Sequence, residues 1–211
     1  MCSPACLTPT SRSRSRAPDH TDVTTPIGVP GRGDFGPAVD AFDAAADALL
    51  EQLRDHPLAD RLFLAASHLG DFSLIWHLAS LIRAVTRRRP DQAIVLAAAL
   101  GLESLIVNQG VKRLFRRTRP TSSGDARLQV RRPSTSAFPS GHASAAAFAA
   151  ATLIAWDGRR WAPLWISLAA IVGVSRAYVK IHHPSDVVGG AVTGLALAAL
   201  ARPAIKRFAG R

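Results

Sequence analysis

Five long apolar stretches occupy most of the chain after residue 60 and are separated by short polar segments. They cover residues 62–85, 93–111, 143–156, 161–174 and 187–201. A transmembrane helix needs about 20 predominantly apolar residues, within a range of about 17–25, so these stretches match spans of ordinary or short length. No segment alternates apolar and polar residues with the period of a strand. We therefore predict an all-α integral membrane protein, a helical bundle with about five transmembrane helices.

An amphipathic segment precedes the bundle at residues 38–55. One face carries Val39, Phe42, Ala46, Leu49, Leu50 and Leu53, and the other carries Asp40, Asp43, Asp47, Glu51 and Arg54. The apolar positions recur with helical spacing, which predicts a helix. The many charged residues exclude a membrane span, so this helix is expected to lie either on a protein core or at the membrane interface.

Residues 1–36 differ from the rest of the chain in composition. They are rich in Ser, Thr, Pro, Gly and Arg and have no periodic apolar pattern. Such a composition cannot bury a core, so we predict a disordered basic tail over residues 1–36 and a membrane-embedded domain over residues 37–211. Cys2 and Cys6 both lie in the tail, which excludes a disulfide-stapled scaffold or a four-cysteine zinc site in the body.

The alternative to a membrane bundle is a soluble all-α protein with buried helices. Trp161 and Trp165 lie next to Arg159 and Arg160, and aromatic and basic residues together are typical of the membrane interface. This arrangement favours the membrane.

The chain of 211 residues is 48% hydrophobic and yet carries a formal net charge of +11. A strongly basic balance is typical of proteins that bind nucleic acid, an anionic membrane surface or a phosphorylated substrate. With a membrane bundle as the body, we expect the bilayer and a phosphorylated substrate as partners, and no nucleic acid.

Three polar clusters interrupt the apolar stretches, at residues 112–120, 139–142 and 175–186. The first follows the second stretch and the second precedes the third stretch. The chain then crosses the membrane, turns at residues 157–160 and crosses back before it reaches the third cluster. All three clusters are therefore expected on one face of the membrane.

The residue types in these clusters suit a phosphoryl group. Lys112, Arg119 and Arg176 supply three cations that can surround its oxygens. Ser140 and Gly141 begin a helix, where free backbone N–H groups bind anions, and Gly141 permits close approach of the backbone.

Two histidines and a carboxylate add the means to break a phosphorus–oxygen bond. His182 and Asp186 are four residues apart, so one helical turn would place the carboxylate beside the imidazole. The carboxylate would fix the tautomer of His182 while the other ring nitrogen attacks phosphorus. His142 remains as a second imidazole that can protonate the departing oxygen. No third ligand with suitable spacing completes a metal site, so no metal is expected.

Together these residues resemble the tripartite signature of the type-2 phosphatidic acid phosphatase superfamily. The matching motifs are Lys112-x6-Arg119-Pro120, Pro139-Ser140-Gly141-His142 and Ser175-Arg176-x5-His182-x3-Asp186, and the resemblance covers residues 38–202. It implies hydrolysis of a phosphomonoester or diphosphate through a phosphohistidine, without a metal or cofactor. It also implies that His182 is the nucleophile, Asp186 its orienting partner and His142 the general acid, while Lys112, Arg119, Ser140, Gly141 and Arg176 hold the phosphate. Many relatives have six spans, whereas five are evident here.

The expected substrate is a lipid phosphate that reaches the site laterally. A polyprenyl phosphate or diphosphate is the first choice, and phosphatidate or phosphatidylglycerophosphate the second. The Ala- and Arg-rich composition is similar to that of high-GC actinobacterial proteins, which adds a polyprenyl-phosphoryl sugar phosphate. The alternatives from other classes are a vanadium haloperoxidase-like protein and a non-enzymatic basic membrane protein.

Several charged residues are left outside the predicted site. Asp71 and Glu103 are costly in a bilayer and so default to functional or paired roles, but the sequence assigns them no partner. A basic loop is expected to face solvent or headgroups, with contact to a substrate diphosphate as the alternative. Its members are Arg113, Arg116, Arg117, Arg127, Arg131 and Arg132.

Basic residues are nearly balanced between the two membrane faces. Once Lys112, Arg119 and Arg176 are assigned to phosphate, the face opposite the site carries more of them, although the basic tail counts in the other direction. The positive-inside rule then predicts a multi-pass protein of the cell membrane with an extracytoplasmic site.

Overall fold

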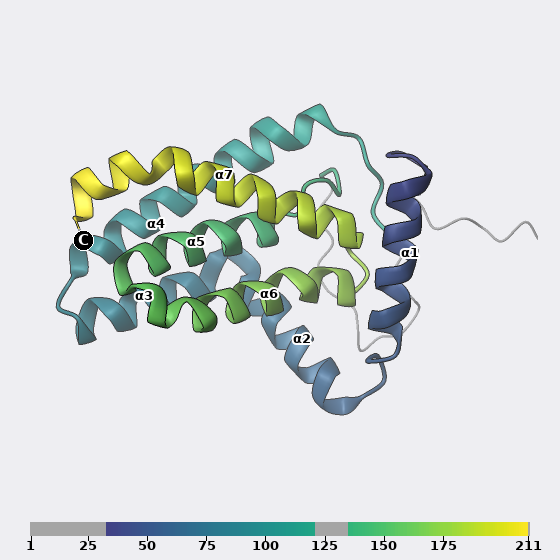
Figure 1. Ribbon diagram of the computed structural model, residues 1–211, viewed down its shortest axis with the longest axis horizontal. Coiled ribbons are helices and arrows are strands. Elements are labelled where there is room, and N and C mark those ends of the chain that lie inside the picture. Colours follow the sequence, from purple (N-terminus) through teal and green to yellow (C-terminus); the bar gives the residue numbers. More distant parts are fainter. Residues whose placement is uncertain (1–32, 121–134, 211) are drawn as a thin grey trace, which may run out of the picture.

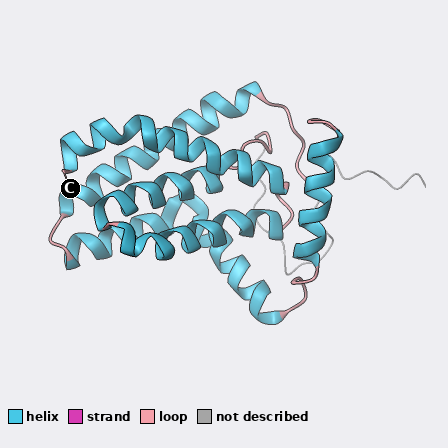
Figure 2. Cartoon of the chain, in the orientation of Figure 1, coloured by secondary structure: helices cyan, strands magenta, loops and turns pink. Residues whose placement is uncertain are grey.

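The computed structural model describes residues 33–120 and 135–210. Seven α-helices lie in this part of the chain: α1 (Pro37–Glu51), α2 (Pro57–Gly70), α3 (Leu74–Thr86), α4 (Pro90–Leu105), α5 (Gly141–Asp157), α6 (Ala162–Tyr178) and α7 (Pro184–Ala209). Short 3-10 or π segments adjoin them: η1 (Asp71–Ser73), η2 (Ile106–Gly110), η3 (Val111–Leu114) and η5 (Arg159–Trp161). Figure 2 shows helices joined by loops, and the described ranges contain no strand, which confirms the all-α prediction. Most of the predicted tail lies outside the described residues.

Three helical segments are long and apolar enough to cross a membrane. They are Pro57–Thr86, Pro90–Leu114 and Pro184–Ala209. The two remaining helices of the bundle, α5 and α6, have 17 residues each. At 1.5 Å per residue each of them is about 25 Å long, slightly less than the hydrocarbon core of a typical bilayer. The chain is thus a helical membrane bundle, and its number of spans, about five, stays a prediction.

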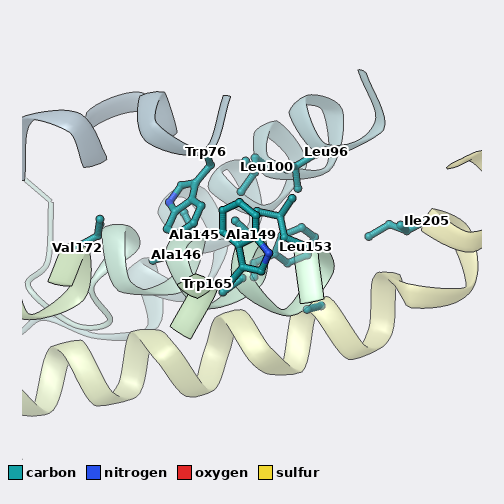
Figure 3. Packing of buried hydrophobic residues seen from close by; sticks show 13 residues of the cluster. Trp76, Leu96, Leu100, Ala145, Ala146, Ala149, Leu153, Trp165, Val172 and Ile205 are labelled. Carbon is teal, nitrogen blue, oxygen red and sulfur yellow. The ribbon is translucent and has the colours of Figure 1, made fainter. Parts of the chain in front are cut away.

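Helix α5 lies at the centre of the bundle and is buried on nearly all sides. Its first turns carry a run of alanines, and large side chains from the surrounding helices pack around it. Trp76 of α3, Leu96 and Leu100 of α4, Leu153 of α5 and Trp165 of α6 form this core (Figure 3). The small residues of α5 therefore let the neighbouring helices approach its backbone closely.

Helices α5 and α7 pack most closely where α7 presents Gly190 and Gly194. A Cβ atom built on Gly194 would lie 2.8 Å from the carbonyl carbon of Ser144, and one built on Gly190 would lie 3.2 Å from that of Ser140. Only a residue without a side chain fits at such distances. This contact aligns the first turns of α5 and α7, which both carry predicted site residues.

The bundle has two polar ends, as the predicted chain crossing requires. At one end Arg83 of α3 donates to the Asp157 carboxylate at the end of α5 and to Gln92 of α4. Trp165 was expected at the membrane interface, but it is buried and donates from its indole nitrogen to Asp157. Because it satisfies this buried carboxylate, it packs inside the bundle, whereas Trp161 lies partly exposed.

Helix α1 crosses the opposite end of the bundle, beside the first turn of α7 and the last turn of α6 (Figure 1). Asp43 of α1 and Arg54 in the turn after it are buried, whereas Glu51 at the end of α1 is exposed. Phe42 and Leu49 of α1 and Leu53 in the turn after it are exposed by 47%, 64% and 46%, whereas Leu50 packs against the buried residues Tyr178, Val179 and Ile181. Of the two placements open for this helix, the structure favours the membrane interface over a protein core.

Candidate active site

The predicted site residues gather at the end of the bundle that α1 crosses. Helix α5 begins there with Ser140 as its N-cap, and the Ser140 hydroxyl accepts a hydrogen bond from the Ala143 backbone N–H at 3.5 Å. The Ser140 backbone N–H donates to the Asp186 carbonyl oxygen at 2.9 Å, which joins the starts of α5 and α7. A Cβ atom on Gly141 would lie 3.7 Å from Lys112 Nζ, so this lysine lies over the start of α5.

The three predicted cations are buried and lie close enough to interact electrostatically with one another. Arg119 is fixed by donating to the carbonyl oxygens of Thr135 and Ile181. Arg176 donates to the backbone carbonyl and hydroxyl of Ser67, while its Nε is buried without a hydrogen-bond partner among the described residues. Three like charges held together in a low-dielectric interior favour binding of an anion.

His182 lies next to these cations, in the turn between α6 and α7. Arg119 Nη1 is 2.9 Å from His182 Nε2. Because arginine only donates hydrogen bonds, Nε2 accepts and the ring proton is on Nδ1. His182 Nδ1 lies 3.6 Å from Asp186 Oδ2, a little beyond hydrogen-bond length. The carboxylate and imidazole are adjacent as predicted, although His182 precedes the helix and only Asp186 belongs to the first turn of α7.

Burial controls the protonation of His182. It lowers the pKa of the imidazole to about 3, and the nearby Arg119 and Lys112 charges act in the same direction. Neutral His182 therefore keeps a lone pair on Nε2 at neutral pH. This lone pair is directed at the cation cluster.

His142 occupies the first turn of α5 and is paired with a residue that was left outside the predicted site. Its Nε2 donates to Asp71 Oδ1 at 2.9 Å. Asp71 lies at the break between α2 and α3, where Phe72 and Ser73 adopt positive φ angles of 52° and 58°. Arg176 Nη1 is 3.9 Å from the same carboxylate oxygen. The cost of a carboxylate in a bilayer was the signal for a paired role, and the structure identifies its partners.

Arg117 was expected in a solvated basic loop, but its side chain is fully buried. It donates to Asp186 Oδ1 at 2.8 Å and to Asp43 Oδ2 at 2.7 Å. These two ion pairs compensate the burial of its charge. Arg113 and Arg116 are exposed as expected, and Arg127, Arg131 and Arg132 lie outside the described residues.

Glu103 is a second acidic residue to which the sequence assigned no partner. It is buried on α4 and accepts a hydrogen bond from the Ser144 hydroxyl of α5. Within residues 33–120 and 135–210, no three His, Cys, Asp or Glu side chains are placed to share a metal ion. The expectation that activity needs no metal remains a prediction.

Comparison with known proteins identifies related sequences and folds. A family model described as the PAP2 superfamily matches residues 92–208. The chain is 32% identical over 136 residues to the decaprenylphosphoryl-5-phosphoribose phosphatase of Mycobacterium tuberculosis H37Rv. The aligned residues make up 64% of this chain and 73% of the relative. Identity to the Mycolicibacterium smegmatis protein of the same name is 34% over 129 residues, 60% of this chain and 68% of the relative.

Two solved structures have a similar fold. The PAP2-type phosphatidylglycerolphosphate phosphatase of Bacillus subtilis has a TM-score of 0.63 at 24% identity, over 84% of this chain and 90% of that protein. LpxE of Aquifex aeolicus has a TM-score of 0.61 at 22% identity, over 77% of this chain and 95% of that protein. At these identities the likeness concerns the fold.

Proposed function

The chain belongs to the PAP2 superfamily and is a membrane phosphatase, and from this premise we propose that it hydrolyses a polyprenyl lipid phosphate through a phosphohistidine on His182. The observation that carries the proposal is the 2.9 Å separation between His182 Nε2 and Arg119 Nη1. It places the lone pair of a neutral imidazole beside a guanidinium that could bind a phosphoryl oxygen of the substrate.

In the proposed first step, Nε2 of His182 attacks the phosphorus atom of the substrate. A nitrogen–phosphorus bond forms and the bond from phosphorus to the lipid-side oxygen breaks. Lys112, Arg119 and Arg176, with the backbone N–H groups at Gly141, would stabilise the charge on the phosphoryl oxygens. Asp186 would stabilise the positive charge that develops on His182, and His142 would donate a proton to the departing oxygen.

In the proposed second step, water attacks the phosphohistidine. His142, now neutral, accepts a proton from the water, the nitrogen–phosphorus bond breaks, and inorganic phosphate leaves with His182 restored. The same residue acts first as acid and then as base, as microscopic reversibility requires. Asp71 would keep the His142 ring in one orientation through both steps.

The choice of a polyprenyl substrate is supported by the relatives. The two reported relatives, each more than 30% identical, are by their names decaprenylphosphoryl-5-phosphoribose phosphatases. A polyprenyl-phosphoryl sugar phosphate ends in a phosphomonoester, whose phosphoryl group the three buried cations could hold. We therefore place it before undecaprenyl diphosphate, phosphatidate and phosphatidylglycerophosphate.

An extracytoplasmic site in the cell membrane is supported by the exposed basic residues. At the end opposite the site these are Arg87, Arg88, Arg159, Arg160, Arg202, Lys206 and Arg207. Arg117 is compensated by two carboxylates inside the protein, and Lys112, Arg119 and Arg176 are assigned to the phosphate, so these buried cations do not count toward orientation. In a Cys2→Ser/Cys6→Ser background, an impermeant maleimide should label Arg116→Cys in intact cells, and Arg160→Cys only after permeabilisation. The reverse pattern would place the site in the cytoplasm.

A phosphate-release assay of the purified protein in detergent tests the function. The substrates are decaprenylphosphoryl-5-phosphoribose, undecaprenyl diphosphate, phosphatidate and phosphatidylglycerophosphate. We expect the highest kcat/KM with the first, unchanged rates in EDTA, and an acid-labile phosphoenzyme. His182→Ala should abolish turnover and phosphoenzyme, whereas His56→Ala, at an exposed position, should not.

Three results would contradict the proposal. No release from any of the lipids would refute the function, and full turnover by His182→Ala would refute the mechanism. Halide oxidation with added vanadate, in place of phosphate release, would favour the haloperoxidase alternative.

A further inference from the structure

A buried ionic network connects α1 to the first turn of α7. Arg117 lies at its centre and donates from Nη2 to Asp43 Oδ2 at 2.7 Å and from Nη1 to Asp186 Oδ1 at 2.8 Å. Nη1 also donates to the Ser185 hydroxyl at 2.7 Å. The side chains of Arg117, Asp43 and Asp186 are 0%, 1% and 0% exposed. One guanidinium thus bridges two carboxylates from different helices.

Asp43 also caps α7 from outside that helix. Its Oδ1 accepts from the Ser185 backbone N–H at 2.7 Å, and its Oδ2 accepts from the Ser185 hydroxyl at 2.8 Å. The first N–H groups of a helix have no partner within the helix. Since Pro184 has no N–H, Ser185 is the first residue of α7 that needs one. A residue of α1 therefore satisfies the start of the helix that carries Asp186.

Hydrogen bonds to both carboxylate oxygens restrain the rotation of the Asp186 side chain. Oδ1 accepts from Arg117, and Oδ2 accepts from the His183 backbone N–H at 2.8 Å. Oδ2 is also the atom that faces His182 Nδ1. Without Arg117, Oδ1 would lose this hydrogen bond, and the backbone hydrogen bond from His183 to Oδ2 would have to hold the carboxylate beside the nucleophile.

We propose that Arg117 and Asp43 are positioning residues that hold Asp186 against His182, so that α1 is a necessary part of the active site. This inference rests on the proposed function, because it assigns Asp186 and His182 their roles. The contacts described for Arg117 and Asp43 lead to Ser185 and Asp186, so we assign these two residues to act through Asp186. Their loss should therefore reduce the rate of the chemical step and leave substrate binding in place.

The test uses substitutions that keep shape, because removal of a buried partner destabilises a protein. Asp43→Asn keeps an oxygen for the Ser185 N–H but loses the charge, and Arg117→Lys keeps the charge but loses the two-pronged geometry. Asp47→Asn and Arg116→Lys are the matched controls. Asp47 lies one turn further along α1 and pairs with Arg54, and Arg116 is exposed beside Arg117.

We expect Asp43→Asn and Arg117→Lys each to lower kcat about 10- to 100-fold, as a misplaced catalytic group does, with KM within about twofold. The double variant should lose little more than the worse single variant, because the two residues act as one unit. The controls should keep wild-type kcat. Rates are normalised to the amount of monodisperse protein. The inhibition constant of inorganic phosphate should be the same in the variants as in the wild type.

Several outcomes would overturn the inference. Wild-type kcat in both single variants would do so, as would a rise in KM at constant kcat. An equal loss in Asp47→Asn would show that α1 acts only by stabilising the fold. These results are read with His182→Ala beside them: if His182→Ala is inactive while both single variants are fully active, the inference alone fails. If His182→Ala keeps its turnover, the phosphohistidine mechanism of the proposed function fails.

Discussion

The contact between α5 and α7 leaves no space for a methyl group at Gly194. A Cβ atom there would lie 2.8 Å from the carbonyl carbon of Ser144 and 3.0 Å from its Cα, and closer still to the carbonyl oxygen. These are backbone atoms of α5, so no change of side-chain rotamer relieves the overlap. In Gly194→Ala the two helices have to separate by about 1 Å to restore van der Waals contact.

This separation has a thermodynamic and a kinetic consequence. Overpacking of a closely packed site costs about 1–3 kcal/mol, which corresponds to about 2–4 °C in Tm for each kcal/mol in a protein of 150–250 residues. The site is divided between the two helices, since His142 begins α5 and Asp186 begins α7. A misplacement of about 1 Å can cost about 100-fold in rate. We expect Gly194→Ala to lower Tm by several degrees and kcat by about 10- to 100-fold.

Thermal unfolding and phosphate release of the purified variant in detergent measure both effects. The matched control is Gly101→Ala on α4, where a Cβ atom meets nothing within 4 Å. Alanine there should stabilise the helix by about 0.5–1 kcal/mol and leave turnover unchanged. Wild-type Tm and kcat in Gly194→Ala would show that this contact does not set the spacing of the two helices.

Two further predictions concern the histidines. In single-turnover measurements of the first step, His142→Ala should slow release of the lipid-side alcohol about 10²- to 10⁴-fold but release of p-nitrophenol from p-nitrophenyl phosphate far less, because an aryl leaving group needs no proton; an equal loss in this step with both substrates would exclude a general acid. Burial lowers the pKa of His182 from 6.5 to about 3, so between these values only the unfolded chain binds a proton, and stability falls as the pH falls. The decrease in Tm from pH 7.5 to 4.5 should therefore be smaller in His182→Gln than in the wild type, and unchanged in His68→Gln; equal slopes in all three would contradict the burial of a neutral His182.

The sequence was sufficient to predict the helical bundle and the meeting of distant motifs. Apolar stretches of membrane length determine the helices, and their alternating direction brings Lys112, Ser140 and His182 to one end. These predictions depend on local composition and chain direction only. The structure agrees with these predictions, since neither local composition nor chain direction depends on how side chains pack.

Residues that act through a tertiary partner could not be found in this way. Arg117 is one of several arginines in a basic run, and nothing in its spacing indicates that it is buried between Asp43 and Asp186. The periodicity of α1 identifies Asp43 as polar but not that the polar face turns inward. Asp71 gave a signal through its cost in a bilayer, yet its pairing with His142 depends on the kink at Phe72.

The inverted packing of α1 connects the membrane surface to the site. On its inner side, Asp43 meets Arg117 and Ser185 at 2.7–2.8 Å. Phe42 and Leu49 on its outer side and Leu53 in the turn after it are exposed, and burial of such side chains in an apolar environment contributes about 1.5–3 kcal/mol each. A bilayer that covers this face therefore stabilises α1 in the position from which Asp43 reaches Arg117. In the proposed mechanism, loss of that environment would weaken the hold on Asp186, so the surface helix would be a structural condition for catalysis.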